Sequence, residues 1–330
     1  FQSMERQMRD MADNWFHLHY IPLLLKEIDC LCHFVAGFRM KDADTTEAMK
    51  RNTRPVLFFH GEKDTYVYPN NSFQNYMLCK APKELVIVQG ARHLCSAYAD
   101  PELYQRTVME FFEKENIDVV FHCANQGGSR KTGYDVAAPD VIGNNLKMFF
   151  NMERCLKDGM KLINFGSGAQ YNKARDLVKV KEDTIGTVIQ KDDYGYSKYV
   201  MSEYLGVRES SNKPGIIYNP IIFGLYGQGE DYTFKFISNA IMKNLLEMPI
   251  VINQNVVFDY LYLGDFLKVM DKLIEEDVPN QEFNITPTES IDLCSIVEII
   301  NEIGDFKSEV TVKNPGLNYQ YTADNTRLLE

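Results

Sequence analysis

The sequence predicts an α/β fold in which a parallel sheet is covered by helices on both faces. Short apolar runs, several of them followed by glycine, alternate along the chain with longer segments of helical periodicity. Such runs are typical of strands buried on both faces, and a repeated strand–helix order favours parallel pairing. The 45% hydrophobic and 25% charged residues are ordinary for a globular protein.

The first part of the chain is predicted to be helical. Apolar side chains recur at helical spacing within residues 5–50 and end near Gly37, and residues 42–48 favour a further short helix. The apolar positions are Trp15, Ile21, Leu24, Leu25, Ile28, Leu31 and Phe34. Before them, residues 1–4 (Phe-Gln-Ser-Met) look like the remnant of a cleavable purification tag, so the native sequence is expected to begin at Met4.

From residue 55 onward the pattern changes to alternating strands and helices. Asp100 as N-cap and Pro101 in the first turn favour the start of one of these helices. The predicted strands are residues 55–60, 84–89, 117–122, 161–166, 214–219, 250–252 and 256–262. The predicted helices are residues 72–79, 101–114, 139–157, 193–210, 232–244, 265–275 and 291–303.

The composition excludes several classes of function. A formal net charge of -11 argues against a surface for nucleic acid or anionic membrane. No apolar stretch approaches the roughly 20 residues of a membrane span. The seven cysteines are irregularly spaced and include no C-x-x-C pair, so we expect reduced thiols and no metal site. With no signal-peptide pattern at the start, the sequence predicts a cytoplasmic protein.

Asp64 and His93 follow two neighbouring predicted strands. Because the carboxyl ends of parallel strands share one edge of a sheet, they are expected to meet as an acid and a base. Their motifs, His60-Gly-Glu-Lys-Asp64 and Gly90-Ala-Arg-His93, make residues 5–115 resemble the C-terminal part of an α/β-hydrolase. The resemblance implies that Asp64 orients a catalytic His93. No G-x-S-x-G elbow supplies a nucleophile, so the pair is expected to be inert.

Tyr194 and Lys198 lie four residues apart, on one face of the predicted helix 193–210. An ammonium group beside a phenol favours the phenolate, so Tyr194 can exchange a proton with a substrate hydroxyl. Tyr196 is two residues from Lys198, on a different helix face, and is the less favoured acid/base. Ser167 ends the preceding strand, about 27 residues upstream of Tyr194.

Residues 116–330 resemble the extended short-chain dehydrogenase/reductase family, specifically its NAD-dependent epimerase/dehydratase members. The similar segments are Ile117–Ala124, Asn144–Leu146, Gly166–Gly168, Tyr194–Lys198, Asn219–Pro220, Phe223–Gly227, Phe258–Tyr262 and Phe283–Ile285. The resemblance implies a Rossmann-like fold, with a substrate-binding part from about residue 220. It also implies NAD or NADP as cofactor and a small-molecule substrate, either a sugar or a nucleotide sugar. Helices 139–157 and 193–210 are then candidates for a homodimer contact.

The same resemblance implies roles for individual residues. Tyr194 is the acid/base, Lys198 tunes the tyrosine and holds the cofactor ribose, and Ser167 binds the reacting oxygen. Asn145 supports the lysine through water. The implied cofactor contacts are Ala124, Tyr194, Lys198, Asn219 and Pro220.

The sequence departs from this family where the dinucleotide should bind. The opening strand and the G-x-x-G-x-x-G turn are missing, and neither Gly127-Gly128 nor Gly224-x-x-Gly227-x-Gly229 has the required place or spacing. Because such glycines let the backbone approach the pyrophosphate, cofactor binding and activity are both in doubt. The arginines that bind nucleotide sugars are absent at Ile221 and in residues 258–260, which weakens that substrate assignment.

Two partial folds therefore meet near residues 110–117. The unbroken β-α-β-α-β run over residues 55–122 suggests one merged parallel sheet, with strands 55–60 and 84–89 replacing the missing nucleotide-binding strands. Three functions remain open. The chain is an NAD(P)-dependent epimerase, dehydratase or reductase acting on a sugar-like substrate, a catalytically silent natural or engineered chimera, or an esterase-like hydrolase without a recognisable nucleophile.

Overall fold

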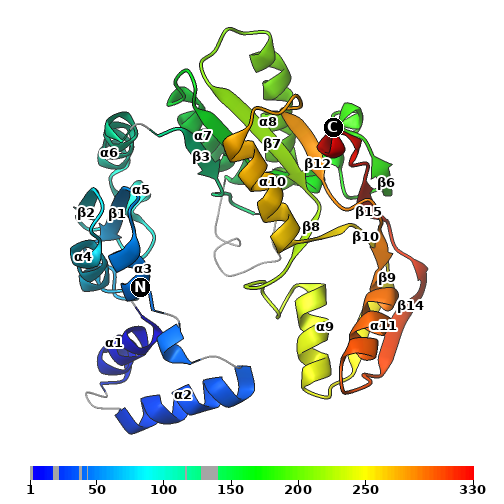
Figure 1. Cartoon of the computed structure of the whole chain (residues 1–330), viewed down its shortest axis with the longest axis horizontal. Helices are drawn as coiled ribbons and strands as arrows, with labels where there is room; N and C mark the ends of the chain where they lie inside the picture. Colours follow the sequence, from blue (N-terminus) through cyan, green and yellow to red (C-terminus); the bar gives the residue numbers. More distant parts are fainter. Residues whose placement is uncertain (1–2, 18–21, 37–38, 43, 116, 128–139) are drawn as a thin grey trace. The chain divides into compact units, whose positions relative to one another are not determined.

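The computed structural model describes residues 3–17, 22–36, 39–42, 44–115, 117–127 and 140–330 (Figure 1). The chain divides into two compact units, Phe1–Ile117 and Asp118–Glu330, here called unit 1 and unit 2. Of the residues singled out from the sequence, Ile21, Gly37 and Gly128 lie outside the described ranges.

Unit 1 consists of helices and one pair of parallel strands. Strands β1 and β2 pair in register from Val56↔Lys83 to Gly61↔Val88. The Asp100 side chain accepts a hydrogen bond from Leu103 N at 2.9 Å and so caps α6, as the sequence predicted. The elements are α1 (Met4–Phe16), α2 (Pro22–Ala36), η1 (Met40–Asp42), α3 (Thr46–Arg51), β1 (Val56–Gly61), α4 (Pro69–Leu78), β2 (Lys83–Val88), α5 (Ser96–Ala99) and α6 (Pro101–Lys114).

Unit 2 is built on a parallel sheet of order β12-β7-β4-β3, with β5 pairing to β7. Its strands are β3 (Val119–His122), β4 (Lys161–Asn164), β5 (Gly166–Ser167), β7 (Ile216–Ile222) and β12 (Glu282–Ile285). Every pairing within this sheet is parallel, and the α/β fold with a parallel sheet is therefore confirmed.

Helices cover both faces of this sheet (Figure 1). On one face, α10 (Leu263–Glu275) packs Phe266, Met270 and Leu273 against Ile163 and Tyr218. Adjacent strand residues point to opposite faces, so their neighbours Leu162 and Ile217 face the other side. The helices α7 (Val141–Arg154) and α8 (Asp193–Glu209) lie on that side.

The hypothesis of one merged sheet stays a prediction. In the described part of the chain, β1 and β2 pair with each other within unit 1, and β3 pairs with β4 within unit 2. The alternation of strands and helices in a sequence shows that strands are buried. It does not determine which strand edges meet, because edge pairing depends on tertiary contacts far apart in the chain.

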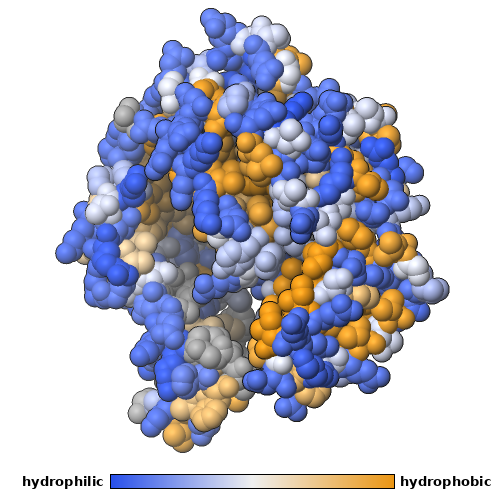
Figure 2. Space-filling model, turned by 45° about the vertical axis from the view of Figure 1, so that its right-hand side comes forward, coloured by the Kyte–Doolittle hydropathy of each residue, from blue (hydrophilic) through white to orange (hydrophobic). Residues whose placement is uncertain are grey.

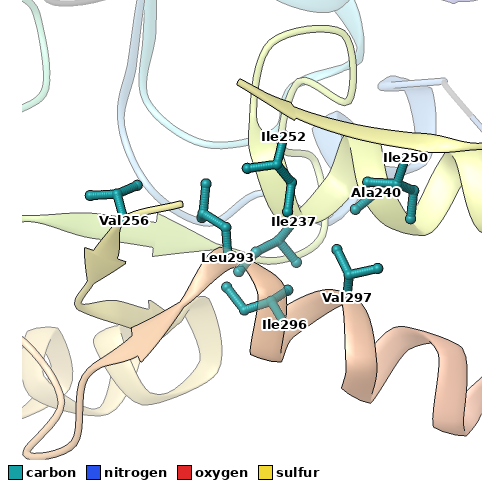
Figure 3. Packing of buried hydrophobic residues seen from close by; sticks show 8 residues of the cluster. All are labelled: Ile237, Ala240, Ile250, Ile252, Val256, Leu293, Ile296 and Val297. Atoms are coloured by element: carbon teal, nitrogen blue, oxygen red, sulfur yellow. The ribbon is translucent and has the colours of Figure 1, made fainter. Parts of the chain in front are cut away.

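A smaller layer follows in unit 2, formed by α9, β9, α11 and β14. Figure 3 shows apolar side chains of α9, β9 and α11 pointing toward one another, among them Ile237, Ile252 and Val297. These three side chains are at most 9% exposed. The remaining elements of unit 2 are η3 (Gly168–Tyr171), β6 (Leu177–Val180), η4 (Glu182–Thr184), β8 (Gly224–Tyr226), α9 (Phe236–Leu245), β9 (Ile250–Asn255), β10 (Val257–Phe258), β11 (Tyr260–Tyr262), β13 (Ile291–Asp292), α11 (Leu293–Ile303), β14 (Val310–Leu317), β15 (Tyr321–Ala323) and α12 (Thr326–Leu329).

The outer surface of this smaller layer is apolar in part. Figure 2 shows hydrophobic residues gathered in the lower right of the view, where α9 and α11 lie in Figure 1. Leu245 at the end of α9 and Ile303 at the end of α11 are 70% and 80% exposed. Among the described helices, none is both long and apolar enough to cross a membrane.

Candidate active site

A cavity of about 340 Å³ opens in unit 2 beyond the carboxyl ends of β3, β4 and β7. Ligands of open parallel sheets bind at this edge, because the loops that follow the strands converge there. Polar and aromatic side chains from distant parts of the chain line it, including Cys123, Asn125, Ser167, Tyr194, Phe223 and Tyr321. The structure therefore brings Ser167 and Tyr194 together, as the sequence predicted.

Ser167 is held in place by the first turn of η3. It is the N-cap residue, and its Oγ accepts a hydrogen bond from Ala169 N at 3.3 Å. In return, Gln170 Oε1 accepts a hydrogen bond from Ser167 N at 3.3 Å. This reciprocal capping box fixes both the backbone and the side chain of Ser167 at the cavity wall.

Tyr194 lies in the first turn of α8, whose N-cap Asp192 accepts a hydrogen bond from Gly195 N at 2.8 Å. The Tyr194 side chain lines the same cavity as Ser167. Burial raises the pKa of the Tyr194 phenol, the nearby Ser167 hydroxyl opposes that rise, and the charge of Asp192 adds to it. The runner-up acid/base, Tyr196, is 37% exposed and stacks near Tyr199, away from the cavity lining.

Lys198 is almost completely buried, with 3% of its surface exposed. Its Nζ donates a hydrogen bond to Phe165 O at 2.7 Å and lies 5.8 Å from the centre of the Tyr194 ring. Burial lowers the pKa of Lys198 to about 8. Tyr194 and Lys198 thus share one helix face, as their spacing predicted, and an ammonium lies close enough to favour phenolate on Tyr194.

Asn145 supports the loop after β3. Its Oδ1 accepts from Gln126 N at 2.7 Å, and its Nδ2 donates to Gln126 O at 2.9 Å and to Ser197 Oγ at 3.0 Å. The amide therefore connects this loop to α8 next to Lys198. Its expected link to Lys198 through water stays a prediction.

The other implied cofactor contacts lie beside the cavity. Cys123 and Asn125, the two neighbours of Ala124, line it. Asn219 and Pro220 are buried within β7, and the Asn219 side chain bonds Asn164 and Glu282. Further along the same segment, Ile222 and Phe223 form the wall. Cofactor contact by Ala124, Asn219 and Pro220 stays a prediction.

The sequence reasoning missed several residues of this site. Tyr321 lines the cavity together with Ser167 and Tyr194, although its segment carried no recognisable motif. Lys173 and Lys235 add two cations to the lining. His122, at the end of β3, is buried, and its pKa is lowered to about 4 by burial and by the charge of Lys198. Its position at the end of a predicted strand was the one sequence feature that could have identified His122 as a residue of the site.

The described residues fit one half of a nicotinamide dinucleotide. Tyr194 and the buried Lys198 suit the nicotinamide and its ribose, because a phenol and an ammonium can bind ribose hydroxyls. The diphosphate would need a glycine-rich strand–turn–helix unit. Among the described residues no strand pairs with the outer edge of β3, so this second half finds no counterpart there. The described residues also contain no group of three or more side chains that could hold a metal ion.

Unit 1 contains a separate polar pair. His93 Nδ1 lies 2.8 Å from Asp64 Oδ2, and Asp64 Oδ1 accepts hydrogen bonds from Tyr66 N and Val67 N, both at 2.9 Å. Asp64 is 4% exposed, while the His93 side chain is 27% exposed. The predicted meeting of the two residues is confirmed. Their arrangement orients the imidazole, because the carboxylate accepts a proton held on Nδ1.

Comparisons with known proteins place much of the chain in one family. Residues 96–286, more than half of the chain, match the family model described as the NAD dependent epimerase/dehydratase family. The matched segment begins at residue 96, whereas the sequence motifs placed the start of the family resemblance at residue 116. No protein of curated function matches the sequence significantly.

Solved structures show a similar fold. One is a UDP-glucuronic acid 4-epimerase from Bacillus cereus in complex with UDP-glucuronic acid and NAD, with 19% identity, 86% of each chain covered and a TM-score of 0.55. A second is a UDP-glucose 4-epimerase from Thermotoga maritima with UDP-glucose, with 18% identity, 68% of this chain and 73% of that chain covered and a TM-score of 0.53. A third is a dTDP-glucose 4,6-dehydratase from Bacillus anthracis in complex with NAD, with 13% identity, 84% and 89% covered and a TM-score of 0.52.

Proposed function

Because the chain belongs to the NAD-dependent epimerase/dehydratase family, we propose that Ser167, Tyr194 and Lys198 transfer a proton at a hydroxyl group of a sugar-like substrate. The observation that carries this proposal is the meeting of Ser167 and Tyr194 in one cavity, with Lys198 buried behind them. NAD or NADP, when bound, supplies or accepts the hydride.

The proton passes between the substrate hydroxyl and the phenol oxygen of Tyr194. Ser167 lines the same cavity as that phenol, so its hydroxyl can hold the reacting oxygen beside Tyr194. Burial lowers the pKa of Lys198 to about 8, and in its protonated form Lys198 carries a positive charge behind Tyr194. This charge stabilises the Tyr194 phenolate while the proton is on the substrate.

A nucleotide sugar is the substrate class that we propose. Lys173 and Lys235 line the cavity and supply positive charge for a phosphate in a protein whose net charge is -11. Position 221 is isoleucine and residues 258–260 contain no arginine, so these two lysines supply the positive charge that arginines would otherwise supply. The similar structures include epimerases solved with UDP-glucose and with UDP-glucuronic acid.

The first experiment measures cofactor binding. NADH and NADPH are titrated with the protein while the nicotinamide fluorescence is recorded. We expect saturable binding that Lys198→Ala weakens by about tenfold or more, since removing one buried charged hydrogen-bond partner costs about 1.5–3 kcal/mol. Lys268→Ala is the control, because Lys268 is exposed on α10 and pairs with Asp265.

Absence of binding at millimolar cofactor would overturn the proposed activity. That result would favour the alternative of a folded, catalytically silent chimera. The observation that supports this alternative is the missing glycine-rich turn, together with the pairing of β1 with β2 in a sheet of their own.

A second candidate activity concerns unit 1. The hydrogen bond of 2.8 Å between His93 and Asp64 favours an esterase-like general base, although no nucleophile elbow is present. The test is hydrolysis of an activated ester. A rate that His93→Ala abolishes and Tyr194→Phe leaves intact would support this activity, whereas equal rates in both variants and the parent protein would exclude it.

A further inference from the structure

A chain of buried polar side chains leads from Ser167 into the interior of unit 2. Ser167 N donates a hydrogen bond to Gln170 Oε1 at 3.3 Å, and Gln170 Nε2 donates to Ser202 Oγ at 3.4 Å. Ser202 Oγ in turn donates to Glu282 Oε1 at 2.6 Å. Gln170 and Ser202 are 0% and 5% exposed, so a polar group left without a partner at either position would be costly.

A second amide donates to the same oxygen of Glu282. Asn219 Nδ2 lies 2.5 Å from Glu282 Oε1, and Asn219 Oδ1 accepts from Asn164 Nδ2 at 2.8 Å. Burial raises the pKa of Glu282, and the hydrogen bonds from Ser202 and Asn219 oppose the rise. Because two donors converge on Oε1, a proton bound by this carboxyl group would lie on Oε2. Glu282 Oε1 is therefore an acceptor whether the carboxyl group is charged or neutral.

The acceptor on Glu282 determines how the Ser202 hydroxyl and the Gln170 amide are oriented. A serine hydroxyl has one hydrogen to donate, and Ser202 donates it to Glu282. Toward Gln170, Ser202 can therefore only accept, so Gln170 turns its NH₂ group to Ser202 and its carbonyl oxygen to the N–H of Ser167. The reverse orientation of the Gln170 amide would place its NH₂ group against the Ser167 N–H, with two donors facing each other.

We propose that Glu282 is a positioning residue, which orients the Gln170 amide through Ser202 and thereby holds the backbone of Ser167 at the wall of the candidate active site. Gly166 leaves room for this arrangement. A Cβ at Gly166 would lie 3.2 Å from Gln170 Oε1, which is closer than ordinary van der Waals contact. The catalytic meaning of the arrangement rests on the proposed function, but the arrangement itself does not.

Glu282 acts on Ser167 from outside the candidate active site. Together with Ser202, it lines a second cavity of about 320 Å³. Among the described residues, none lines both this second cavity and the cavity that contains Ser167 and Tyr194. An effect of Glu282 on Ser167 can therefore be separated from direct contact with a substrate or cofactor.

The test is hydrogen exchange, measured by NMR on the whole chain without cofactor. Two groups report on the proposed arrangement, the side-chain NH₂ of Gln170 and the backbone N–H of Ser167. Their exchange rates are divided by that of the Ile163 N–H, in the middle of β4. Glu282→Leu removes the acceptor and should raise both ratios about tenfold, the effect of one lost hydrogen bond. A general loss of stability would speed exchange at Ile163 as well and leave the ratios unchanged.

Two matched variants separate the acceptor on Glu282 from its charge. Glu282→Gln removes the carboxyl group but keeps an oxygen that can face Ser202 and Asn219, so both ratios should stay at the parent value. Glu203→Gln removes an exposed carboxylate that lines the same second cavity from α8, and it should also leave the ratios unchanged.

Ser202→Ala tests the route through Ser202 and keeps the proposal testable if Glu282→Leu does not fold. It removes the link between Glu282 and Gln170 but leaves Asn219 bonded to Glu282, and it should raise both ratios about tenfold. Adding Glu282→Leu should raise them no further. Unchanged ratios in Ser202→Ala, or ratios in Glu282→Gln as high as in Ser202→Ala, would overturn the proposal. Failure to bind NADH would count against the proposed function alone, because this measurement needs no cofactor.

Discussion

At the scale of single residues, burial and hydrogen bonding set the chemistry of the cavity. Tyr194 and Tyr196 are two residues apart on α8, yet of the two only Tyr194 lines the cavity with Ser167. Both carry the same phenol. Substituting each of these two tyrosines separately therefore tests which one is the acid/base.

We predict that Tyr194→Phe lowers kcat for turnover of a nucleotide sugar by about 10²–10⁴-fold, the usual contribution of a positioned acid/base. Binding of NADH should weaken by roughly tenfold or less, because only the one hydrogen bond that the phenol can make to the ribose is lost. Steady-state rates and cofactor fluorescence measure the two quantities. Tyr196→Phe should keep the parent rate, and an equal loss in both variants would show that Tyr194 is not the acid/base.

His122 should make the protein sensitive to acid. Its pKa in the folded state is about 4, below its ordinary value of 6.5, so the unfolded chain binds more protons between these values. Stability is then fully present above pH 6.5 and lost as the pH falls toward 4. Urea unfolding at pH 7.5 and pH 5 should show a loss of about 2 kcal/mol from this one group.

The control for that experiment is a pair of variants. His122→Leu removes the titrating group and should reduce the loss of stability between the two pH values. His33→Gln changes an exposed histidine and should retain the full loss. An undiminished loss in His122→Leu would refute the assignment.

At this scale the sequence found the residues with the strongest spacing. Four-residue spacing places Tyr194 and Lys198 on one helix face wherever a helix forms, so that prediction depended on local geometry only. Tyr321 could not be found in this way. It lines the same cavity as Ser167 although the two residues are 154 positions apart in sequence, because β15 pairs with β6 and β10 and because Gly168 leaves room for its ring.

At the scale of elements, the smaller layer of unit 2 depends on the apolar contacts among α9, β9 and α11. Along β9, Ile252 is 1% exposed and packs in this core, whereas its neighbour Val251 is 42% exposed. Two adjacent positions of one strand thus point to opposite faces.

We predict that Ile252→Ala lowers the free energy of unfolding by about 2–5 kcal/mol, because it removes buried methylene groups and leaves a cavity. Val251→Ala on the exposed face should cost roughly 1 kcal/mol or less. Denaturation in urea, followed by circular dichroism, compares the two. Equal losses would contradict the packing in Figure 3.

The predicted helices and strands agree with the structure where the apolar pattern of the sequence was strong. The helix expected at 193–210 is α8, Asp193–Glu209. The strand expected at 256–262 is instead two strands, β10 and β11, separated by the fully buried Asp259, which accepts from Ala323 N at 2.8 Å. Strand β14 went unpredicted, because all of its residues are exposed and only its pairing with β9 makes it a strand.

At the scale of the whole molecule, the sheet of unit 2 carries a cavity whose residues suit the nicotinamide half of a dinucleotide. This sheet ends at β3 in the described residues, with no strand beyond it to begin a glycine-rich turn. The adenosine diphosphate portion of NADH would therefore gain little from the protein.

We predict that NADH and reduced nicotinamide mononucleotide bind with dissociation constants within about threefold of each other. About 1.4 kcal/mol of binding free energy corresponds to a tenfold change in the dissociation constant. Favourable contacts of the protein with the adenosine diphosphate would therefore separate the two dissociation constants by far more than threefold. Fluorescence titrations of both molecules measure the ratio. Binding of NADH that is tighter by a hundredfold would show that the chain holds the diphosphate after all.

The sequence by itself determined the α/β class, the order of the strongly apolar elements and the residues Ser167, Tyr194, Lys198, Asp64 and His93. The class and the elements follow from periodicity and turn chemistry, the Tyr194–Lys198 pair from helical spacing, and Ser167, Asp64 and His93 from the resemblance to two families. Only the tertiary structure decided which strands pair, that Asn219 points into a buried network and that Tyr321 lines the cavity with Ser167. The physical reason is that strand edges and side chains far apart in sequence choose their partners through packing, which no local pattern encodes.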